Sequence, residues 1–218
     1  MCGRYSLLAR RADLVRAFPR LLLSEDYDAA HPPRYNVAPS QPVATITNRE
    51  PSSLTMLPWG LPTGRTGSAA INARGESVAD KPSFRRAFRS QRCLIPADGY
   101  YEWRNADGER SPVRVVRRSR EPFAFAGIWE AGCAIVTCAA RGALAEVHDR
   151  EPVILAPSTY DEWLSDETPI ERLRALTVRA LPDDDLEFYD VSKLVNSPKN
   201  ETPEVIERVE SPPALRLF

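Results

Sequence analysis

Runs of apolar residues with strand-like spacing fill the middle of the chain. The clearest lie at residues 113–116, 123–128 and 134–137, and short runs of this kind favour buried strands. Further strand patterns cover residues 2–7, 43–47, 93–96, 99–103, 153–155 and 186–191. The protein is therefore expected to have a β-rich centre.

Helical spacing is confined to short segments at residues 12–18, 82–89 and 158–164, and to one that begins at residue 168. The segment at 82–89 puts its apolar residues on one face and three arginines on the other, which predicts an amphipathic helix with a basic outer ridge. The 20 prolines against 10 glycines favour many short connections over long helices.

Residues 99–103 combine aromatic side chains with one carboxylate. Period-two alternation places Tyr100 and Glu102 on one face of this strand and Tyr101 and Trp103 on the other. A carboxylate held beside aromatic rings loses hydration, which raises its pKa. Glu102 is therefore a candidate acid or base, and the alternative is an ordinary solvent-facing glutamate.

Length and composition bound the class of protein. A chain of 218 residues with 43% apolar and 27% charged residues suits one soluble domain, and we expect that domain to span residues 2–210, with a tail at 211–218. No apolar run is long enough to cross a membrane, and the N-terminus does not resemble a signal peptide. We expect a cytoplasmic protein.

The four cysteines, at positions 2, 93, 133 and 138, include no C-x-x-C pair, and the chain has two histidines. This makes a structural zinc site improbable, so we expect reduced thiols, no metal and no cofactor.

Charge is distributed unevenly although the net charge is −1. Residues 1–120 hold 20 Lys and Arg against 11 Asp and Glu, whereas residues 121–218 hold 9 against 19. A basic first half is what a phosphate-binding face requires. The alternative is a set of solvated arginines scattered over the surface.

Cys2 offers distinctive chemistry if Met1 is removed, because its α-amine and thiol then sit on adjacent carbons. The two groups have ordinary pKa values of about 7.7–8 and about 8.5, so both approach their reactive forms near neutral pH. Such an aminothiol condenses with an aldehyde to an imine, which the thiolate closes to a thiazolidine. The alternative is a small buried residue after the start codon.

The two histidines differ in their surroundings. His31, between an alanine and a proline, is expected to be an exposed loop residue, whereas His148 lies among charges at a strand connection and is the better acid–base candidate. Residues 71–78 are polar and predict a loop of the kind that carries chemistry. Trp59 precedes a turn and is interpreted as a base-stacking residue or a core residue.

Seven segments of the chain form a recognisable set. They are Met1-Cys2-Gly3-Arg4, Arg34-Tyr35-Asn36-Val37-Ala38-Pro39, Trp59-Gly60-Leu61, Ile71-Asn72-Ala73-Arg74, Lys81-Pro82-Ser83-Phe84, Arg92 through Trp103, and His148-Asp149-Arg150. Together, in this order, they resemble one known family, the SOS response-associated peptidases (SRAP), also called abasic site processing proteins. The likeness runs from residue 2 to about residue 204.

The resemblance implies a single compact α+β domain with a β-rich, barrel-like core, short peripheral helices and a groove for single-stranded DNA. It implies a monomer that removes its own Met1 as a peptidase, a hydrolase activity, and then crosslinks abasic sites through a thiazolidine at Cys2, in the DNA damage and SOS response. DNA lyase activity at the abasic site is a further implied property. The protein would be cytoplasmic and associated with the nucleoid when bound to DNA.

The same resemblance implies four catalytic residues. Cys2 would be the nucleophile, Asn72 would hold the Cys2 end and the opened sugar, and Glu102 would shuttle protons. His148 would help to open the sugar ring and to reverse the adduct or cleave the strand.

Seven further residues are implied to contact DNA. Arg4, Asn36, Arg74 and Arg150 would contact phosphates and sugars, while Pro39, Trp59 and Trp103 would stack on bases or wedge between them.

One departure concerns the loop after Trp59-Gly60-Leu61. Many members continue with Pro-x-Trp, whereas here Leu61-Pro62-Thr63-Gly64-Arg65 lacks a second tryptophan. A smaller wedge is expected, which leaves the preferred DNA junction open.

Two other classes remain open. N-terminal nucleophile amidotransferases also begin Met-Cys-Gly and use the cysteine amine as base, but no glutamine-binding motif follows here. A noncatalytic binder of single-stranded DNA, with an incidental Cys2, is the other.

Overall fold

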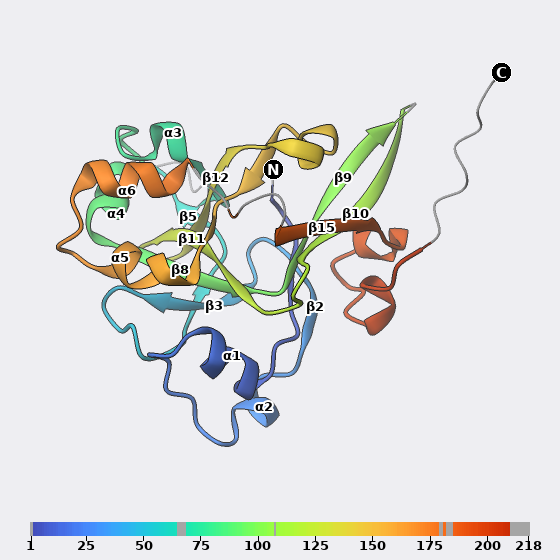
Figure 1. Ribbon diagram of the computed structural model, residues 1–218, viewed down its shortest axis with the longest axis horizontal. Helices are drawn as coiled ribbons and strands as arrows, with labels where there is room; N and C mark the ends of the chain where they lie inside the picture. The colour runs from blue at the N-terminus through green and yellow to red at the C-terminus, as the bar shows by residue number, and fades with distance from the viewer. Residues whose placement is uncertain (1, 65–68, 107, 179–180, 182–184, 210–218) are drawn as a thin grey trace.

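Two β-sheets form the centre of the molecule, and helices pack on the larger sheet (Figure 1). The computed structural model describes residues 2–64, 69–106, 108–178, 181 and 185–209. The tail predicted at 211–218 lies outside the described residues.

The smaller main sheet has five strands in the order β15-β10-β9-β1-β2, with all neighbours antiparallel. Its strands are β1 (Tyr5–Leu7), β2 (Arg34–Val37), β9 (Gly99–Ala106), β10 (Glu109–Arg117) and β15 (Leu186–Asp190). The β9–β10 hairpin extends away from the helices, on the opposite side of the molecule (Figure 1). The start of the chain is thus an interior strand, paired on both edges.

The larger sheet has eight strands, six of them in the order β13-β12-β11-β8-β3-β4, with β14 paired to β11 and β7 paired in parallel to β12. Its strands are β3 (Pro42–Thr47), β4 (Thr55–Pro58), β7 (Asn72–Arg74), β8 (Arg92–Ala97), β11 (Phe123–Trp129), β12 (Cys133–Ala139), β13 (Arg150–Pro152) and β14 (Ile154–Leu155). β8 lies between two neighbours and is buried along its whole length, which explains its nearly continuous apolar run. A separate two-stranded sheet joins β5 (Leu61–Pro62) to β6 (Ala69–Ala70).

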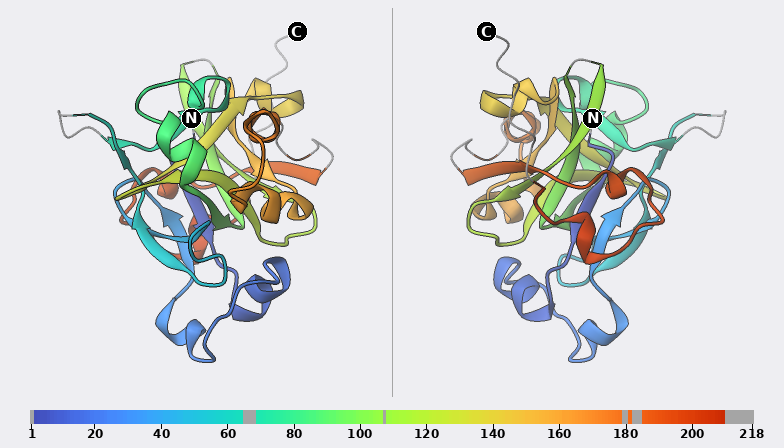
Figure 2. Two further views of the ribbon diagram at one scale, coloured as in Figure 1. Left: turned by 90° about the vertical axis from the view of Figure 1, so that its left-hand side faces the viewer. Right: turned by 90° about the vertical axis from the view of Figure 1, so that its right-hand side faces the viewer.

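All the described helices are short. The α-helices are α1 (Arg11–Ala17), α2 (Tyr27–Ala30), α3 (Gly75–Val78), α4 (Arg85–Ser90), α5 (Tyr160–Leu164) and α6 (Ile170–Thr177). The 3₁₀ turns are η1 (Gly142–Glu146), η2 (Pro157–Thr159), η4 (Lys193–Asn196) and η5 (Pro203–Val205). Helices α3 to α6 contact the larger sheet, while α1 and α2 lie together at one end of the molecule (Figure 2). No described helix has both the length and the apolar character needed to cross a membrane.

Two large apolar cores and one small cluster stabilise this arrangement. One large core, which includes Phe88 and Trp163, lies between the helices and the larger sheet. The other large core gathers side chains from both sheets, among them Cys2, Tyr5 and Tyr100. Burial of these aromatic side chains supplies the main favourable free energy of folding, and it packs the first residues of the chain between the two sheets.

Gly75 determines how the chain turns after β7. A Cβ atom there would lie 2.3 Å from the carbonyl oxygen of Thr177 at the end of α6. Only glycine permits this approach, so α3 packs tightly on α6 and the Asn72–Arg74 strand ends at a fixed point.

Most of the elements predicted from the sequence are present, and the α+β fold is confirmed. The described strands form two main sheets rather than a closed barrel, so the expected barrel-like centre consists of two sheets around a shared core. The helix at 82–89 begins later, at Arg85, with its phenylalanines buried and its arginines exposed as predicted.

One local prediction is wrong. Residues 71–78 are strand β7 followed by helix α3 and not a loop, because β7 gains its hydrogen bonds from β12, a strand distant in sequence. The strands expected at 93–96 and 99–103 are present, but they do not pair with each other: β8 joins the larger sheet and β9 the smaller. The chain therefore crosses between the sheets at Asp98.

Candidate functional site

The first residues of the chain lie beside β9. Tyr5 pairs with Tyr100, and the backbone N–H of Tyr101 donates to the carbonyl of Arg4 over 2.9 Å. Because the pairing is antiparallel, the residues before Arg4 run alongside Glu102. The strand predicted to carry a carboxylate thus supports the predicted nucleophile.

Cys2 lies where the two sheets meet. Asn72, at the start of β7 in the larger sheet, donates its side-chain amide to the carbonyl oxygen of Cys2 over 2.8 Å. The Oδ1 atom of Asn72 is also buried and has no hydrogen-bond partner among the described residues. A buried acceptor without a donor costs about 1–3 kcal/mol, and an amine or hydroxyl entering the site would satisfy it.

The Cys2 side chain is fully buried in this structure. Burial raises the pKa of its thiol well above the ordinary value, and the negative charge of Glu102 acts in the same direction. The thiol is therefore neutral near pH 7 with the chain in this state, and its ionisation lies further from neutral pH than that of an exposed terminal cysteine. Reaction at the sulfur requires that its surroundings change first.

Glu102 is buried, with 4% of its surface exposed. The solvent-facing alternative is therefore wrong. Loss of hydration raises the pKa of its carboxyl to about 7, which suits a group that both accepts and donates protons at neutral pH. Its face of β9 also carries Tyr100, whereas Tyr101 and Trp103 pack with a separate apolar cluster on the other face, as the alternation predicts.

His148 lies between η1 and β13. Its Nδ1 accepts a hydrogen bond from the backbone N–H of Arg150 over 2.9 Å, an acceptor role that belongs to the neutral ring with its proton on Nε2. Burial lowers the pKa of His148, which also favours the neutral form. The carboxylate of Asp149 lies 2.8 Å from the same Nδ1 and would stabilise the ring when protonated.

Strand β12 brings Arg74 and Arg150 to opposite sides of Thr137. Arg74 pairs with Thr137 in register, and Arg150 donates to its carbonyl oxygen over 2.6 Å. Arg74 is exposed. Arg150 is held by both carboxylate oxygens of Glu76, at 2.6 and 2.8 Å. The sequence analysis did not single out Glu76, although a carboxylate two residues after Arg74 could have been considered as a partner for an arginine.

Arg4 and Asn36 organise the C-terminal part of the chain. The Arg4 Nη1 atom donates to Asn36 Oδ1 over 2.7 Å and to the carbonyl of Val195 over 2.5 Å. The buried Asn36 amide donates in turn to the carbonyls of Ser197 and Asn200, both over 2.9 Å. The DNA contact expected at Asn36 is therefore not available in this structure, because its polar atoms are buried and bonded to the protein.

The three expected stacking residues have different surroundings. Trp59 is 1% exposed, donates to the carbonyl of Ile71 over 2.9 Å and packs edge-on against Tyr5, so it is a core residue and does not present a stacking face. Pro39 and Trp103 are half-buried. The guanidinium of Arg4 lies 5.9 Å from the ring centroid of Trp103. Arg65, in the loop that was expected to carry a smaller wedge, lies outside the described residues.

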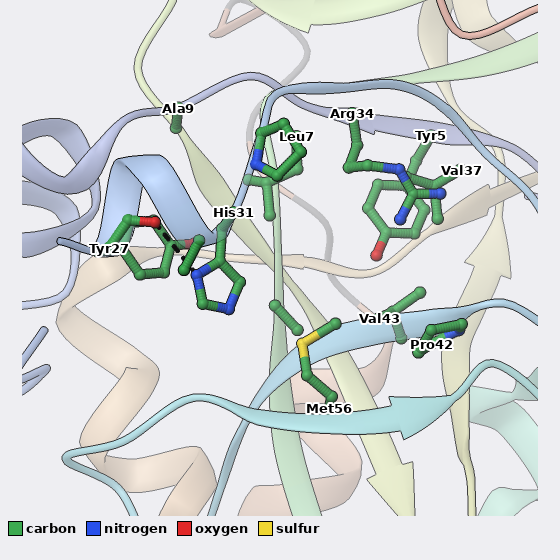
Figure 3. Close-up of a pocket in the computed structure, with 13 residues that line it drawn as sticks. Tyr5, Leu7, Ala9, Tyr27, His31, Arg34, Val37, Pro42, Val43 and Met56 are labelled. Carbon is green, nitrogen blue, oxygen red and sulfur yellow. Dashed lines mark hydrogen bonds between the residues drawn. The ribbon is translucent and has the colours of Figure 1, made fainter. Parts of the chain in front are cut away.

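A separate pocket of about 220 Å³ lies between β1, α2 and the β3–β4 strands (Figure 3). Its wall includes the exposed His31, whose ring stacks on Tyr27 with centroids 4.4 Å apart. The residues that line it include none of Cys2, Asn72, Glu102 and His148. The Cys2 centre is thus distinct from this mainly apolar pocket.

Among the residues that the structure describes, no group of three or more His, Cys, Asp or Glu side chains could hold a metal ion.

The sequence matches one protein family over most of its length. A profile of the family described as SOS response associated peptidase (SRAP) matches residues 1–198. The chain is 39% identical over 227 residues to the abasic site processing protein YoqW of Bacillus subtilis, covering 95% of this chain and 99% of that protein. Identity to the abasic site processing protein YedK of Escherichia coli is 30%, with 96% and 100% covered.

More distant relatives and solved structures agree with this match. The mouse abasic site processing protein HMCES is 26% identical, over 94% of this chain and 75% of that protein. A phage-related protein from Bordetella bronchiseptica superposes with a TM-score of 0.75 at 30% identity, covering 88% of this chain and 95% of that one. A protein from Bacteroides thetaiotaomicron has a TM-score of 0.79 at 21% identity, with 96% and 100% covered, which is a likeness of fold alone.

Proposed function

The chain belongs to the SOS response associated peptidase (SRAP) family, and from that premise we propose that it processes abasic sites in single-stranded DNA by capturing the lesion covalently at Cys2. The relatives named above carry abasic site processing in their names. The observation that carries the proposal is the convergence of Asn72 and Glu102, from two different sheets, on the first residues of the chain.

The first step is removal of Met1. Hydrolysis of the Met1–Cys2 peptide bond consumes one water, releases methionine and leaves the α-amine on Cys2. Glu102, with a pKa of about 7, is suited to take a proton from the attacking water and to return one to the departing amine. Asn72, bonded to the Cys2 carbonyl, holds the residue in place.

The second step captures the ring-opened sugar of an abasic site, which exposes an aldehyde at C1′. The Cys2 amine adds to this carbon and one water leaves, forming an imine. The Cys2 thiol then adds across the C=N bond: a C–S bond forms, the nitrogen receives the proton, and a five-membered thiazolidine results. No electrons are gained or lost, so the reaction needs no redox partner.

His148 completes the set. Its neutral ring, with a proton on Nε2, can donate to the sugar ring oxygen during opening or accept a proton during reversal. Arg74 on β7 and Arg150 on β13, on opposite sides of Thr137, would bind phosphates, and the half-buried Pro39 and Trp103 would contact bases.

Burial of Cys2 defines a requirement of this proposal. The thiol is covered and neutral in the chain that the structure describes, so the strand must reach it after the terminus has been processed and its cover displaced. We propose that residues 2–210 act as one monomeric domain that shields the lesion, with strand cleavage as a secondary activity.

Incubation of the purified protein with an oligonucleotide that carries one abasic site tests the proposal. We expect an adduct stable to heat and SDS, a protein mass short by one methionine before reaction, and no adduct with Cys2→Ala. Cys93→Ala is the matched control, because it removes a buried sulfur from β8, a strand that carries none of the proposed catalytic or DNA-binding residues, at a stability cost of about 1 kcal/mol.

Two outcomes would overturn the proposal in different directions. Undamaged and abasic single strands bound equally, with no adduct from wild type, would indicate a noncatalytic binding protein. Glutamine hydrolysis without an adduct would instead indicate an amidotransferase.

A further inference from the structure

The arginines expected to bind DNA differ in how far their side chains are already engaged. Arg4 donates to Asn36 and to a backbone carbonyl, and Arg150 is bound by both oxygens of Glu76. A guanidinium in a bidentate ion pair must leave its carboxylate before it can bind a phosphate. Arg74 has no such partner among the described residues, but a bound strand needs more than one cation.

Arg110, near the start of β10, is exposed and, among the described residues, unpaired, unlike Arg4 and Arg150. It is exposed, and within the described ranges no hydrogen bond, ion pair or ring contact engages its guanidinium. A solvated, unpaired guanidinium is available to a phosphate at little cost in lost contacts.

The register of the β9–β10 hairpin places Arg110 beside Trp103. Arg110 pairs with Asn105, and Trp103 pairs with Pro112, so Trp103 and Arg110 are diagonal neighbours on the same face. Such positions are about 7–8 Å apart, within reach of aromatic and long side chains. Arg4 lies over the same tryptophan. The ring of Trp103 therefore lies between two cations in space, Arg4 and Arg110.

The charge of Arg110 also reaches the catalytic groups. Burial raises the pKa of Glu102, and the positive charge of Arg110 opposes that rise. Burial lowers the pKa of His148, and Arg110 contributes in the same direction. Arg110 shares the face of Trp103, opposite to Glu102, so its charge acts on both groups at a distance and without contact.

We propose that Arg110 is a phosphate-binding residue of the DNA site, holding the backbone of the strand beside Trp103 while its abasic sugar lies at Cys2. Alternating cationic and aromatic side chains along a surface are suited to single strands, because phosphates and bases alternate in the same way. This proposal rests on the proposed function and adds to it the path that the strand takes over the β9–β10 hairpin.

The experiment measures binding of an undamaged, fluorescently labelled single-stranded oligonucleotide as a function of salt concentration. For Arg110→Gln we expect a several-fold loss of affinity and a slope of log affinity against log salt that is smaller by about 0.7, the contribution of one phosphate contact to a single strand. The loss should be equal for a poly-thymidine and a mixed sequence, since phosphates carry no base information. Arg110→Lys should keep most of the slope.

Arg20→Gln is the matched control, because Arg20 is an exposed arginine whose partner is Asp161, at the helical side of the molecule. Its slope should equal that of wild type. An Arg110→Gln protein with wild-type affinity and slope would overturn the proposal, as would an Arg110→Lys protein as weak as Arg110→Gln. Crosslinking by wild type reports separately on the proposed function, so the two ideas fail by different measurements.

Discussion

The side-chain amide of Asn72 lies 2.8 Å from the carbonyl oxygen of Cys2 and donates a hydrogen bond to it. This bond connects the larger sheet to residues that lead into the smaller one. The Oδ1 atom of the same side chain is buried without a donor among the described residues. The amide nitrogen of Asn72 is therefore bonded to the protein, while its amide oxygen can still accept a hydrogen bond.

Replacing Asn72 with Ala should slow crosslinking while changing stability little. Loss of the bond to Cys2 costs about 1 kcal/mol, but removal of the buried Oδ1 without a donor relieves about 1–3 kcal/mol, so Tm should not fall. Gel assays of adduct formation and thermal melts measure the two effects. Asn48→Ala is the control, since Asn48 also joins separate segments by side-chain bonds but lies at Ser90 and Asp166. Equal slowing by both variants would contradict a specific role for Asn72.

Glu102→Gln should remove a pH dependence of stability. Because the folded-state pKa is raised to about 7, the folded protein binds more protons than the unfolded chain between about pH 4.5 and pH 7, and wild-type stability falls as pH rises through that window. The total is at most about 3 kcal/mol. Denaturant unfolding at several pH values should show that, as pH rises, the free energy of unfolding of the Gln variant increases relative to that of wild type by up to this amount.

The same carboxyl should control the rate of adduct formation. The wild-type rate is expected to rise through an apparent pKa near 7 as Glu102 becomes a base, and Glu102→Gln should be slow without that rise. Glu171→Gln, at an exposed position on α6, should retain the wild-type profile. An unchanged profile in Glu102→Gln would assign the proton transfer to another group.

His148→Ala should slow ring opening or adduct reversal by at least tenfold, a conservative fraction of what general acid–base groups contribute, about 10²–10⁴. Because burial lowers the pKa of His148, its ring is neutral at pH 7 and the defect should be constant at higher pH. Release of the protein from a purified adduct measures the effect. His31→Ala, which alters a histidine in the separate pocket of Figure 3, should behave as wild type.

Glu76→Gln should strengthen binding to single-stranded DNA. Glu76 holds Arg150 through two short bonds and competes with any phosphate for the same guanidinium. Removing its charge should raise affinity about three- to tenfold and steepen the salt dependence. Filter binding or fluorescence anisotropy measures both.

Glu162→Gln is a close control for Glu76, since Glu162 forms the same two-bond pair with Arg172, at 2.6 and 2.9 Å, on an exposed surface. It should leave DNA affinity unchanged. Weaker binding by Glu76→Gln would mean that the ion pair orients Arg150 productively.

Local patterns in the sequence predicted which side chains share a face of one strand or helix, because that depends on neighbouring residues. Alternation along 99–103 placed Glu102 and Tyr100 on one face, and helical spacing buried Phe84 and Phe88. The same reasoning could not assign strands to sheets: β8 and β9 are adjacent in sequence but separate at Asp98, because Asp98 turns the chain by accepting hydrogen bonds from Ser6 and Ala9.

Burial of individual site residues was the other property that the sequence did not determine. Trp59 and Asn36 were expected at the DNA surface, but each has its polar atoms satisfied inside the protein. Whether an aromatic or an amide faces solvent depends on long-range packing against segments such as residues 195–200. The resemblance to the family therefore suggested candidate positions but did not indicate which of them are exposed.

The interior position of β1 has a consequence for synthesis on the ribosome. Its partner β9 is translated about a hundred residues later, and at roughly 5–20 residues per second that delay is about 5–20 s. Until then the N-terminus of the nascent chain does not have Glu102 beside it, and the folded site that joins it to Asn72 has not formed. Under the proposed mechanism, removal of Met1 therefore waits until β9 has been translated, which delays release of the Cys2 amine.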